Sequence, residues 1–469
     1  MKLKRLLALL MAFGLVAAAC GSDDDSADGD TTETTEASGE DTETTEAMEE
    51  DDGEDAGGDA GGDPADVAID SGVTADTIRV GINADLSGPF ASLVAEIVES
   101  QTVYWEWVNE NGGIGGRMVE TVILDSGYAT DKGIENYEAL AQEGEEGVLM
   151  ISENTGSPIT AAIAEDATDD DMLVVPLSWA SLWPANPNVL GKQSTYCAES
   201  MNAISYLAAK VEADGDTPAL AILTRPGEYG LDGAIGASLA AEALGIEVVY
   251  DGTDQVAGDD RTAVISQLVG SGANMVWMTT TGGETLDIFG NAVSQGFEAY
   301  WSGNSPSFDY KVHLASDFAA EFDQYWTHST YQVSWNGNDS QGMQDMVREM
   351  TARRPDLPLS DVYAFGWIEG MLVQQILEQA VGNGDLTRAG VVQAASEIEI
   401  DFKGLAPNQS FFGDYNDIVV RETYMFDVDA TAFDLQPMSA GVGSTGLILE
   451  EGPFVSDVLA GFEFDGPCI

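Results

Sequence analysis

The chain has 469 residues and carries 17 Lys and Arg against 82 Asp and Glu, which gives a formal net charge of −65. This composition offers too few basic residues for the face that binds phosphates, so it argues strongly against nucleic-acid binding. A hydrophobic content of 44% with nine Trp is enough for real cores, and because single cores stop growing near roughly 250–300 residues, two lobes are expected.

Residues 1–19 have the pattern of a lipoprotein signal peptide. Basic residues within the first five positions precede an apolar run at 6–19, which is shorter than the about 20 residues of a membrane-spanning helix. The run ends in three alanines and Cys20, and this end resembles a bacterial lipobox. The resemblance implies cleavage before Cys20 and a lipid on its sulfur that anchors the protein to the outer face of the cell membrane. An ordinary signal peptide with an incidental cysteine is the alternative.

Residues 20–66 form an acidic spacer. From residue 21 to residue 66 there is no Lys, Arg or aromatic residue, and Asp, Glu, Thr, Ser, Gly and Ala dominate. Such a composition cannot offset the entropy of ordering by burial, and like charges extend the chain. The segment is therefore predicted to be a disordered tether, with an acidic recognition tail as the alternative.

From residue 67 on, short β-type runs alternate with longer segments of helical periodicity. Val94, Ile97 and Val98, for example, recur at three- and four-residue spacing, which makes one face of a helix apolar. Alternation of this kind predicts an α/β fold with parallel sheets covered by helices on both faces. Strands are expected at residues 78–83, 119–124, 148–151, 173–176, 220–223, 247–250 and 275–278, and helices at 91–109, 131–143, 158–167, 198–211, 231–244 and 261–269.

Beyond residue 330 the pattern becomes less regular. Helical periodicity continues at residues 341–351 and 361–381, and one clear strand is expected at 422–428. The remaining tail shows no clear periodicity, which leaves its structure open.

Cys197 and Cys468 remain once Cys20 is assigned to the lipid. We predict that they form one disulfide in an oxidising compartment and tie the end of the chain to its middle. The sequence cannot establish the distance that bonding requires. There is no Cys-x-x-Cys or other metal-ligand spacing, and His313 and His328 are the two histidines, so no metal and no cofactor are expected.

Residues 112–116, Gly-Gly-Ile-Gly-Gly, superficially suggest a phosphate loop. They follow a predicted helix and precede a predicted strand, which is the wrong order for a dinucleotide turn. We interpret them as a helix stop and turn in which glycine supplies positive φ. Neither GxxxxGK[ST] nor GxSxG occurs in the chain.

The third expected strand leads into a helix through residues 154–157. Pro158 suits the first helical position, which makes Ser157 the predicted N-cap, with free backbone N–H groups beside it. Ligands of open α/β sheets lie beyond the carboxyl ends of the strands, and a helix N-terminus attracts anions such as a carboxylate. The alternative is that Ser157 caps its own helix and does no more.

Several short sequence motifs occur in an order and spacing that are informative when taken together. They are Leu86-Ser87-Gly88-Pro89, the stretch from Asn109 to Arg117, the stretch from Val174 to Ser178, the stretch from Ala221 to Leu223 followed by Tyr229-Gly230, and the stretch from Asp361 to Ala364. The set resembles the type I periplasmic binding proteins, above all the leucine/isoleucine/valine-binding proteins of ABC importers, over about residues 75–430. Each piece alone is weak, whereas the ordered set is strong.

This resemblance implies two doubly wound α/β lobes with parallel sheets, joined by a three-crossing hinge, that close on a ligand between them. It also implies the limits of the parts. Residues 67–195 and 333–420 would form lobe 1, residues 196–332 and 421–432 would form lobe 2, and residues 433–469 would be a C-terminal extension with no recognised counterpart.

The resemblance assigns ligand contacts to strand ends in both lobes. In the family, the loop before the third helix grips the ligand's carboxylate, a role that falls here to Gly156 or Ser157. Trp179 stands where a small hydroxyl residue is commoner and would form a flat apolar wall. Some of the aromatic residues are equally well explained as ordinary packing. The expected ligand-binding residues are Phe90, Gly156, Ser157, Leu177, Ser178, Trp179, Tyr229, Thr280 or its neighbour Thr281, Asn304 and Ser305.

One departure from the family concerns the ligand's amino group. Amino-acid binders of this family place an acidic residue after the strand equivalent to residues 299–301, yet residues 302–307 carry no charge, and the sequence does not place Glu284 in the cleft. A buried ammonium without a carboxylate partner is costly. The expected ligand is therefore an amino acid, of the branched-chain type, or a related small carboxylate or amide.

The predicted function is that of an extracytoplasmic, lipid-anchored solute-binding protein. It would capture a small molecule by closure of two lobes and deliver it to an ABC permease with its ATPase subunits, catalysing no reaction itself. The first alternative is a receptor that reports ligand occupancy to a membrane signalling partner. The second alternative, a hydrolase acting at Ser157 or Ser178, lacks a base because both histidines lie on other segments.

Overall fold

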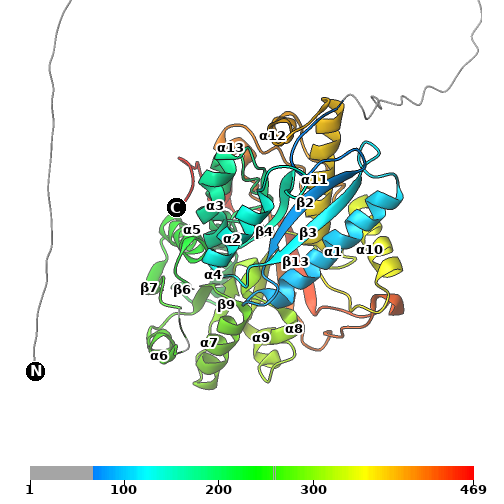
Figure 1. Cartoon of the computed structure of the whole chain (residues 1–469). Helices are drawn as coiled ribbons and strands as arrows, with labels where there is room; N and C mark the ends of the chain where they lie inside the picture. The colour runs from blue at the N-terminus through cyan, green and yellow to red at the C-terminus, as the bar shows by residue number, and fades with distance from the viewer. Residues whose placement is uncertain (1–66, 257, 259) are drawn as a thin grey trace, which may run out of the picture. The chain divides into compact units, whose positions relative to one another are not determined.

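The computed structural model describes residues 67–256, 258 and 260–469 (Figure 1). The expected signal peptide, the lipid-anchor residue Cys20 and the tether lie outside the described residues. Two parallel four-stranded sheets dominate the described part, and we call each sheet with its helices a lobe. Within this part, no helix is both long enough and apolar enough to cross a membrane.

Lobe 1 combines two stretches of the chain. Its elements are β2 Thr77–Ala84, α1 Ala91–Glu110, β3 Met118–Asp125, α2 Thr130–Leu140, β4 Met150–Thr155, α3 Ser157–Asp169, β5 Val174–Leu177, α10 Gln341–Arg353, α11 Tyr363–Gly382 and α12 Arg388–Glu397. The strand order is β3-β2-β4-β5, all parallel. Ile78, Val80 and Ile82 of β2 are fully buried, as expected for a strand covered on both faces. A short parallel pair, β1 Ala68–Ile69 and β11 Asp385–Leu386, ties the start of the described chain to α12.

Lobe 2 repeats this architecture. Its elements are α4 Tyr196–Ala213, β6 Ala219–Thr224, α5 Glu228–Leu244, β7 Glu247–Gly252, α6 Thr262–Gly270, β8 Met275–Thr279, α7 Gly282–Ser294, β9 Tyr300–Gly303, α8 Tyr310–His313 and α9 Ala319–Tyr325. The parallel order β7-β6-β8-β9 matches that of lobe 1, so both sheets are doubly wound and the predicted fold class is confirmed. Helices α4 and α5 approach closely because residue 236 is glycine; a Cβ there would lie 2.1 Å from the Cys197 carbonyl oxygen.

A third, antiparallel sheet lies beside lobe 2. It consists of β10 Thr327–Thr330, β12 Thr423–Val428 and β13 Leu447–Phe454 in the order β10-β12-β13. The sequence predicted β12 alone. Strand β10 has four buried residues and too little length for a period, and β13 is mostly exposed without alternation, so neither carries the two-residue signal of a half-buried strand.

Beyond β12 the chain returns once more to lobe 1. Residues 429–446, which we call the C-terminal return segment, run from β12 to β13 and pack Met438 into the core of lobe 1. The Met438 N–H donates to the Leu357 carbonyl at 2.8 Å, and the Leu359 N–H donates to the Gln436 carbonyl at 3.0 Å. The segment therefore links the lobes in addition to the three connections that precede α4, follow β10 and precede β12.

The last residues fold onto lobe 2 through the predicted disulfide. Cys197 and Cys468 are bonded, with their Cα atoms 6.5 Å apart. Helix α14, Asp457–Ala460, packs against α4 and α5, and Leu459 and Phe464 are buried in the same core. The end of the chain thus backs the helices of lobe 2.

Residues 112–116 form the predicted stop and turn after α1. Their four glycines have positive φ, and a Cβ on Gly113 would lie 2.0 Å from the Arg117 carbonyl oxygen. The close approach requires glycine there, which accounts for the motif without a ligand.

Candidate ligand-binding cavity

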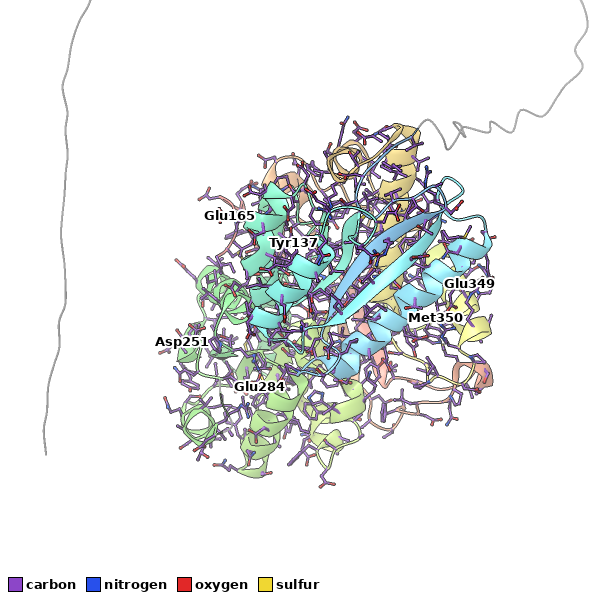
Figure 2. All side chains as sticks on the ribbon, viewed as in Figure 1. Tyr137, Glu165, Asp251, Glu284, Glu349 and Met350 are labelled. Atoms are coloured by element: carbon purple, nitrogen blue, oxygen red, sulfur yellow. A yellow bond between two sulfur atoms is a disulfide. The ribbon has the colours of Figure 1, made fainter. Side chains whose placement is uncertain are left out.

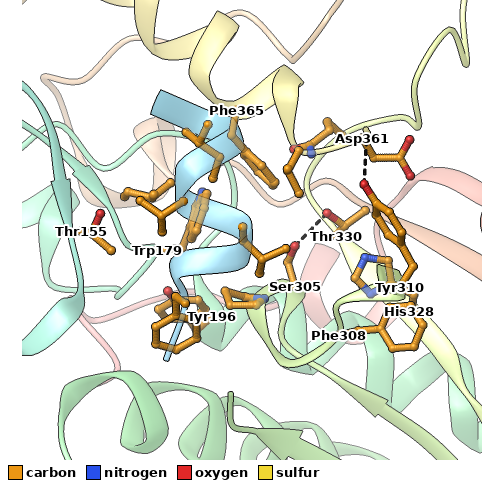
Figure 3. A pocket seen from close by; sticks show the side chains of 18 of the residues that line it. Thr155, Trp179, Tyr196, Ser305, Phe308, Tyr310, His328, Thr330, Asp361 and Phe365 are labelled. Carbon is orange, nitrogen blue, oxygen red and sulfur yellow. Dashed lines mark hydrogen bonds between the residues drawn. The ribbon is translucent and has the colours of Figure 1, made fainter. Parts of the chain in front are cut away.

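A cavity lies between elements of the two lobes. Aromatic and aliphatic side chains dominate its lining; among the described lining residues, Asp361 is the single acidic side chain and there is no Lys or Arg. Figure 3 shows Thr155 and Trp179 on one side of the cavity and His328 and Asp361 on the opposite side. We call the first side, formed by Thr155, Gly156 and Ser157, the α3 end.

The α3 end is shaped by a glycine. Gly156, at φ 104°, is the N-cap of α3, and Ser157 is the first helical residue without a side-chain cap bond. The prediction that Ser157 caps the helix is therefore wrong. A Cβ on Gly156 would lie 2.7 Å from the Tyr128 ring, so this turn needs both the freedom and the small size of glycine.

The hydroxyl groups of the α3 end are already paired within the protein. The Oγ atoms of Ser157 and Ser178 are 2.7 Å apart, and Trp183 Nε1 donates to Ser178 Oγ at 3.1 Å. Thr155 Oγ1 donates to Glu153 Oε1 at 3.0 Å. Helix N-termini leave backbone N–H groups without intrahelical partners and favour negative charge. At this end the main chain of the first turn of α3 can supply hydrogen-bond donors to an anion.

Trp179 forms a flat wall of the cavity. Its ring stacks on Tyr331 with centroids 4.8 Å apart, and Lys192 Nζ lies 5.0 Å from the ring centroid. Lys192 is buried, pairs with Glu369 at 2.9 Å and donates to the Pro176 carbonyl at 2.7 Å. Removing one partner of this buried ion pair would be strongly destabilising, so Lys192 and Glu369 are expected to matter for the stability of the protein around Trp179.

Contacts between the lobes hold the cavity closed. Phe90 at the start of α1 and Tyr229 on α5 lie edge to face with ring centroids 6.1 Å apart. Ser92 Oγ of lobe 1 donates to Asp309 Oδ2 of lobe 2 at 2.6 Å. The structure is therefore a closed arrangement of the two lobes.

The side opposite the α3 end follows β10 into the next connection. His328, Thr330 and Gln332 line the cavity there, and we call these three residues the β10 wall. Thr330 Oγ1 pairs with Ser305 Oγ at 2.9 Å (Figure 3). His328 Nδ1 and Gln332 Oε1 are buried and have no hydrogen-bond partner among the described residues. Burial lowers the pKa of His328 to about 3, so its ring is neutral at pH 7.

Asp361 supplies the one carboxylate of the lining. Its Oδ1 accepts a hydrogen bond from the Trp335 N–H at 2.5 Å, and its Oδ2 accepts one from Thr445 Oγ1 of the C-terminal return segment at 2.7 Å. Burial raises the pKa of Asp361 to about 6, against the opposing effect of these two hydrogen bonds. Both oxygens are thus engaged by the protein itself.

Two buried glutamates of lobe 2 do not line the cavity. Glu284 on α7 (Figure 2) completes a capping box with Thr281 and pairs with Arg261 at 3.3 Å. Glu199 accepts from Asn304 Nδ2 at 2.6 Å, and burial raises its pKa to about 8. Among the described residues, lobe 2 therefore contributes no carboxylate to the cavity lining.

Most of the predicted ligand contacts lie on the cavity wall, and whether they touch a ligand stays a prediction. Those on the wall are Phe90, Gly156, Ser157, Leu177, Trp179, Tyr229 and Ser305. The structure does not bring Ser178, Thr280 and Asn304 into the lining, because their polar groups bond to Trp183, Thr285 and Glu199 respectively.

Several lining residues were missed in the sequence. They include Thr155, Tyr196, His328, Thr330, Gln332 and Phe365. A sequence signal existed for Thr155, within the loop before Pro158, and for Phe365, next to the stretch that ends at Ala364. The β10 wall had none, because its strand was not predicted.

Comparison with known proteins identifies the family to which this fold belongs. A family model described as periplasmic binding protein matches residues 77–432. No curated protein sequence matches the chain. A fatty acid ABC transporter substrate-binding protein from Thermomonospora curvata is 25% identical, covers 84% of this chain and 97% of its own, and superposes with a TM-score of 0.74.

Two further solved structures share the fold at lower identity. A branched chain amino acid ABC transporter protein from Thermus thermophilus with bound valine is 15% identical, covers 82% of this chain and 98% of its own, and has a TM-score of 0.68. The branched-chain amino acid transporter substrate binding protein LivJ from Streptococcus pneumoniae, in complex with isoleucine, is 18% identical, covers 76% and 97%, and has a TM-score of 0.62.

Proposed function

The chain belongs to the periplasmic binding protein family, as a type I solute-binding protein of ABC transporters, and we propose that its ligand is an apolar monocarboxylate with an alkyl or aryl chain. The observation that carries this proposal is the predominantly apolar lining of the cavity, which has one carboxylate and no Lys or Arg among its described residues. Small-molecule sites are typically lined by hydrophobic and aromatic side chains with a few polar groups that fix orientation.

The charge distribution favours an acid without an ammonium group. The α3 end offers a helix N-terminus for a carboxylate, whereas Asp361 lies across the cavity and has both oxygens engaged. An α-amino acid needs its two charges compensated side by side, because its ammonium and carboxylate share one carbon. An alkyl or aryl chain, by contrast, suits the wall formed by Trp179, Phe365 and their neighbours.

A branched-chain amino acid is the second candidate. It is favoured by the ordered motifs described above and by the ligands named for two of the solved structures, valine and isoleucine. The fatty acid named for the Thermomonospora curvata protein favours the first candidate.

Ligand capture follows from lobe closure. The contact of Phe90 with Tyr229 and the bond of Ser92 to Asp309 exist only when the lobes meet. A ligand that touches the α3 end and the β10 wall together stabilises that closed state, which is a population shift. The closed protein then delivers the ligand to an ABC permease.

The test is calorimetric titration of the purified protein, stripped of bound ligand, with straight-chain acids from butanoate to dodecanoate, leucine, valine and decan-1-ol. Each buried methylene contributes about 0.8 kcal/mol, so Kd should fall about fourfold per carbon until the cavity is full. Decan-1-ol, which lacks the charge, should bind far more weakly than decanoate. Tighter binding of leucine than of octanoate would reject the proposal in favour of the second candidate.

A matched pair of variants tests where the hydrocarbon chain of the ligand lies. Leu93 lines the cavity, and Leu182 is partly buried outside the lining. In Leu93→Trp, affinity should stop increasing at a shorter acid than in the wild type. In Leu182→Trp, the dependence of affinity on acid length should be unchanged. If Kd depends on acid length in the same way in both variants, the hydrocarbon chain of the ligand does not lie beside Leu93.

We also propose that Cys20 carries the lipid anchor and that residues 21–66 hold the folded part away from the membrane. The support is the run of alanines before Cys20 and the acidic composition of the spacer. Metabolic labelling with a clickable fatty acid should mark the wild-type protein and spare Cys20→Ser. Equal labelling of both would reject the anchor.

A further inference from the structure

Two polar side chains of the β10 wall are buried without partners. His328 is 6% exposed and Gln332 is 3% exposed, and neither side chain makes a hydrogen bond within the described residues. Other buried polar side-chain atoms in the described part also lack partners, but only those of His328 and Gln332 belong to residues of the cavity lining. Buried polar groups are nearly always satisfied in native proteins, so these two point to a partner that enters the cavity.

The wall holds these groups in fixed places. In β10, His328 pairs across the sheet with Phe426, another lining residue, and its ring lies 5.1 Å from that of Phe308. Thr330, two residues on, projects to the same side and is satisfied by Ser305. Gln332 follows two residues after the end of β10, so His328 and Gln332 line the cavity from different positions of the chain.

The side chains of His328 and Gln332 suit uncharged hydrogen-bonding groups of a ligand. A neutral imidazole has one donor and one acceptor, and a glutamine amide offers both kinds of group. Neither supplies a charge to compensate an ammonium or a second carboxylate. A hydroxyl group, which donates and accepts, complements either side chain.

We propose that the ligand is an oxygenated apolar acid, with a carboxylate at the α3 end and at least one hydroxyl group on the edge that faces His328 and Gln332. This inference deepens the proposed function and depends on it. A plain alkyl chain would leave both side chains unsatisfied, and a site with buried unpaired groups discriminates against the analogue that lacks the matching hydroxyl.

The experiment compares decanoate with the hydroxydecanoates that carry their hydroxyl group at successive carbons, by calorimetric titration of the full-length protein. At least one isomer should bind about tenfold or more tightly than decanoate. The preference should fall to about onefold in His328→Phe for one position of the hydroxyl group and in Gln332→Met for a different position. Val94→Ala, a change of an apolar lining residue, should weaken decanoate and its isomers alike and keep the preference.

The possible outcomes distinguish failure of this inference from failure of the proposed function. Binding of decanoate without any preferred isomer overturns this inference and leaves the proposed function standing. A preference that survives in both His328→Phe and Gln332→Met also overturns it, and Gln332→Met alone decides if the histidine variant does not fold. Failure of every straight-chain acid to bind overturns both.

Discussion

The two sides of the cavity differ in how far their polar side chains are hydrogen-bonded within the protein. At the α3 end, the hydroxyl groups of Ser157 and Ser178 bond to one another, and a backbone turn at Gly156 opens the helix N-terminus. Along the β10 wall, His328 Nδ1 and Gln332 Oε1 are buried without a hydrogen-bond partner among the described residues. One side is complete before a ligand arrives, and the other is not.

This difference shows how one cavity can combine affinity with selectivity. A preformed backbone site binds any carboxylate, because main-chain donors do not depend on the rest of the ligand. Unpaired side chains instead penalise every ligand that lacks a matching group. With the proposed ligand, the α3 end would select a charge class, and the β10 wall would select among its members.

The largest expected effect comes from releasing the tail behind the β10 wall. Strand β13 pairs with β12, which pairs with β10, and the residues after β13 are fastened to α4 by the Cys197–Cys468 disulfide. The double variant Cys197→Ser with Cys468→Ser should lose about 4 kcal/mol of unfolding free energy, as is typical for a disulfide that closes a long loop. Urea denaturation at matched temperature measures the loss.

The reductant provides the control for that variant. Reduced wild-type protein should unfold at the urea concentration of the double variant, and the double variant itself should be unaffected by reductant. A wild-type protein that is indifferent to reductant would contradict the structural role of the bond.

The next effect sharpens the α3 end. Gly156→Val places a branched side chain at positive φ and against Tyr128, which distorts the turn that presents the helix N-terminus. Loss of charge-assisted hydrogen bonds to the carboxylate should weaken decanoate by about 3 kcal/mol, or roughly 100-fold in Kd, measured by calorimetry. Decan-1-ol should lose much less.

Gly144→Val is the matched control, since Gly144 also has positive φ, at 82°, but a Cβ there meets nothing within 4 Å. It should bind decanoate as the wild type does. If Gly156→Val weakens the acid and the alcohol equally, the α3 end is not the anion site.

The third effect concerns the carboxylate beside the β10 wall. The pKa of Asp361 is about 6, above its ordinary value of 3.8, chiefly because the side chain is buried. Between these pH values the folded protein binds more protons than the unfolded chain, so this group lowers stability as pH rises. Wild type should therefore lose about 2 kcal/mol relative to Asp361→Asn between pH 4 and pH 6.5.

Urea midpoints of both proteins across this pH range measure the difference. Asp356→Asn, which removes an exposed aspartate, is the control and should track the wild type. A constant difference between wild type and Asp361→Asn would show that Asp361 is ionised throughout.

The smallest effect tests whether the α3 end recognises ligands by main chain or by hydroxyl group. Ser178→Ala leaves Ser157 Oγ and Trp183 Nε1 without a partner, which should cost about 1 kcal/mol of stability. Affinity for decanoate should change by no more than about twofold, because Ser178 lies outside the cavity lining. Ser205→Ala, whose hydroxyl bonds to its own helix at the Met201 carbonyl, is the control for stability. A tenfold loss of affinity would assign the hydroxyl pair to the ligand.

The two sides also differ in how far the sequence predicts them. The α3 end is made by consecutive residues, so a strand, a glycine, a serine and Pro158 in a row indicated a helix N-terminus at a strand end. Even there the capping residue was wrong by one: Gly156 is the N-cap, and the ring of Tyr128, from another loop, lies where a Cβ on residue 156 would be. The β10 wall gave no local signal, since β10 is held by pairing with a strand almost a hundred residues away.

The sequence by itself determined the alternation of strands and helices, and with it the parallel α/β lobes, because apolar periodicity and turn residues act over a few positions. It also determined that residues 302–307 carry no charge for an ammonium group. Only the tertiary structure decided which polar groups remain without partners. Asn304 Nδ2 donates a hydrogen bond to Glu199, whereas Gln332 Oε1 has no partner among the described residues. This difference depends on neighbours that folding brings together. Hydrogen-bond satisfaction is set by contacts between distant segments, and no local pattern records it.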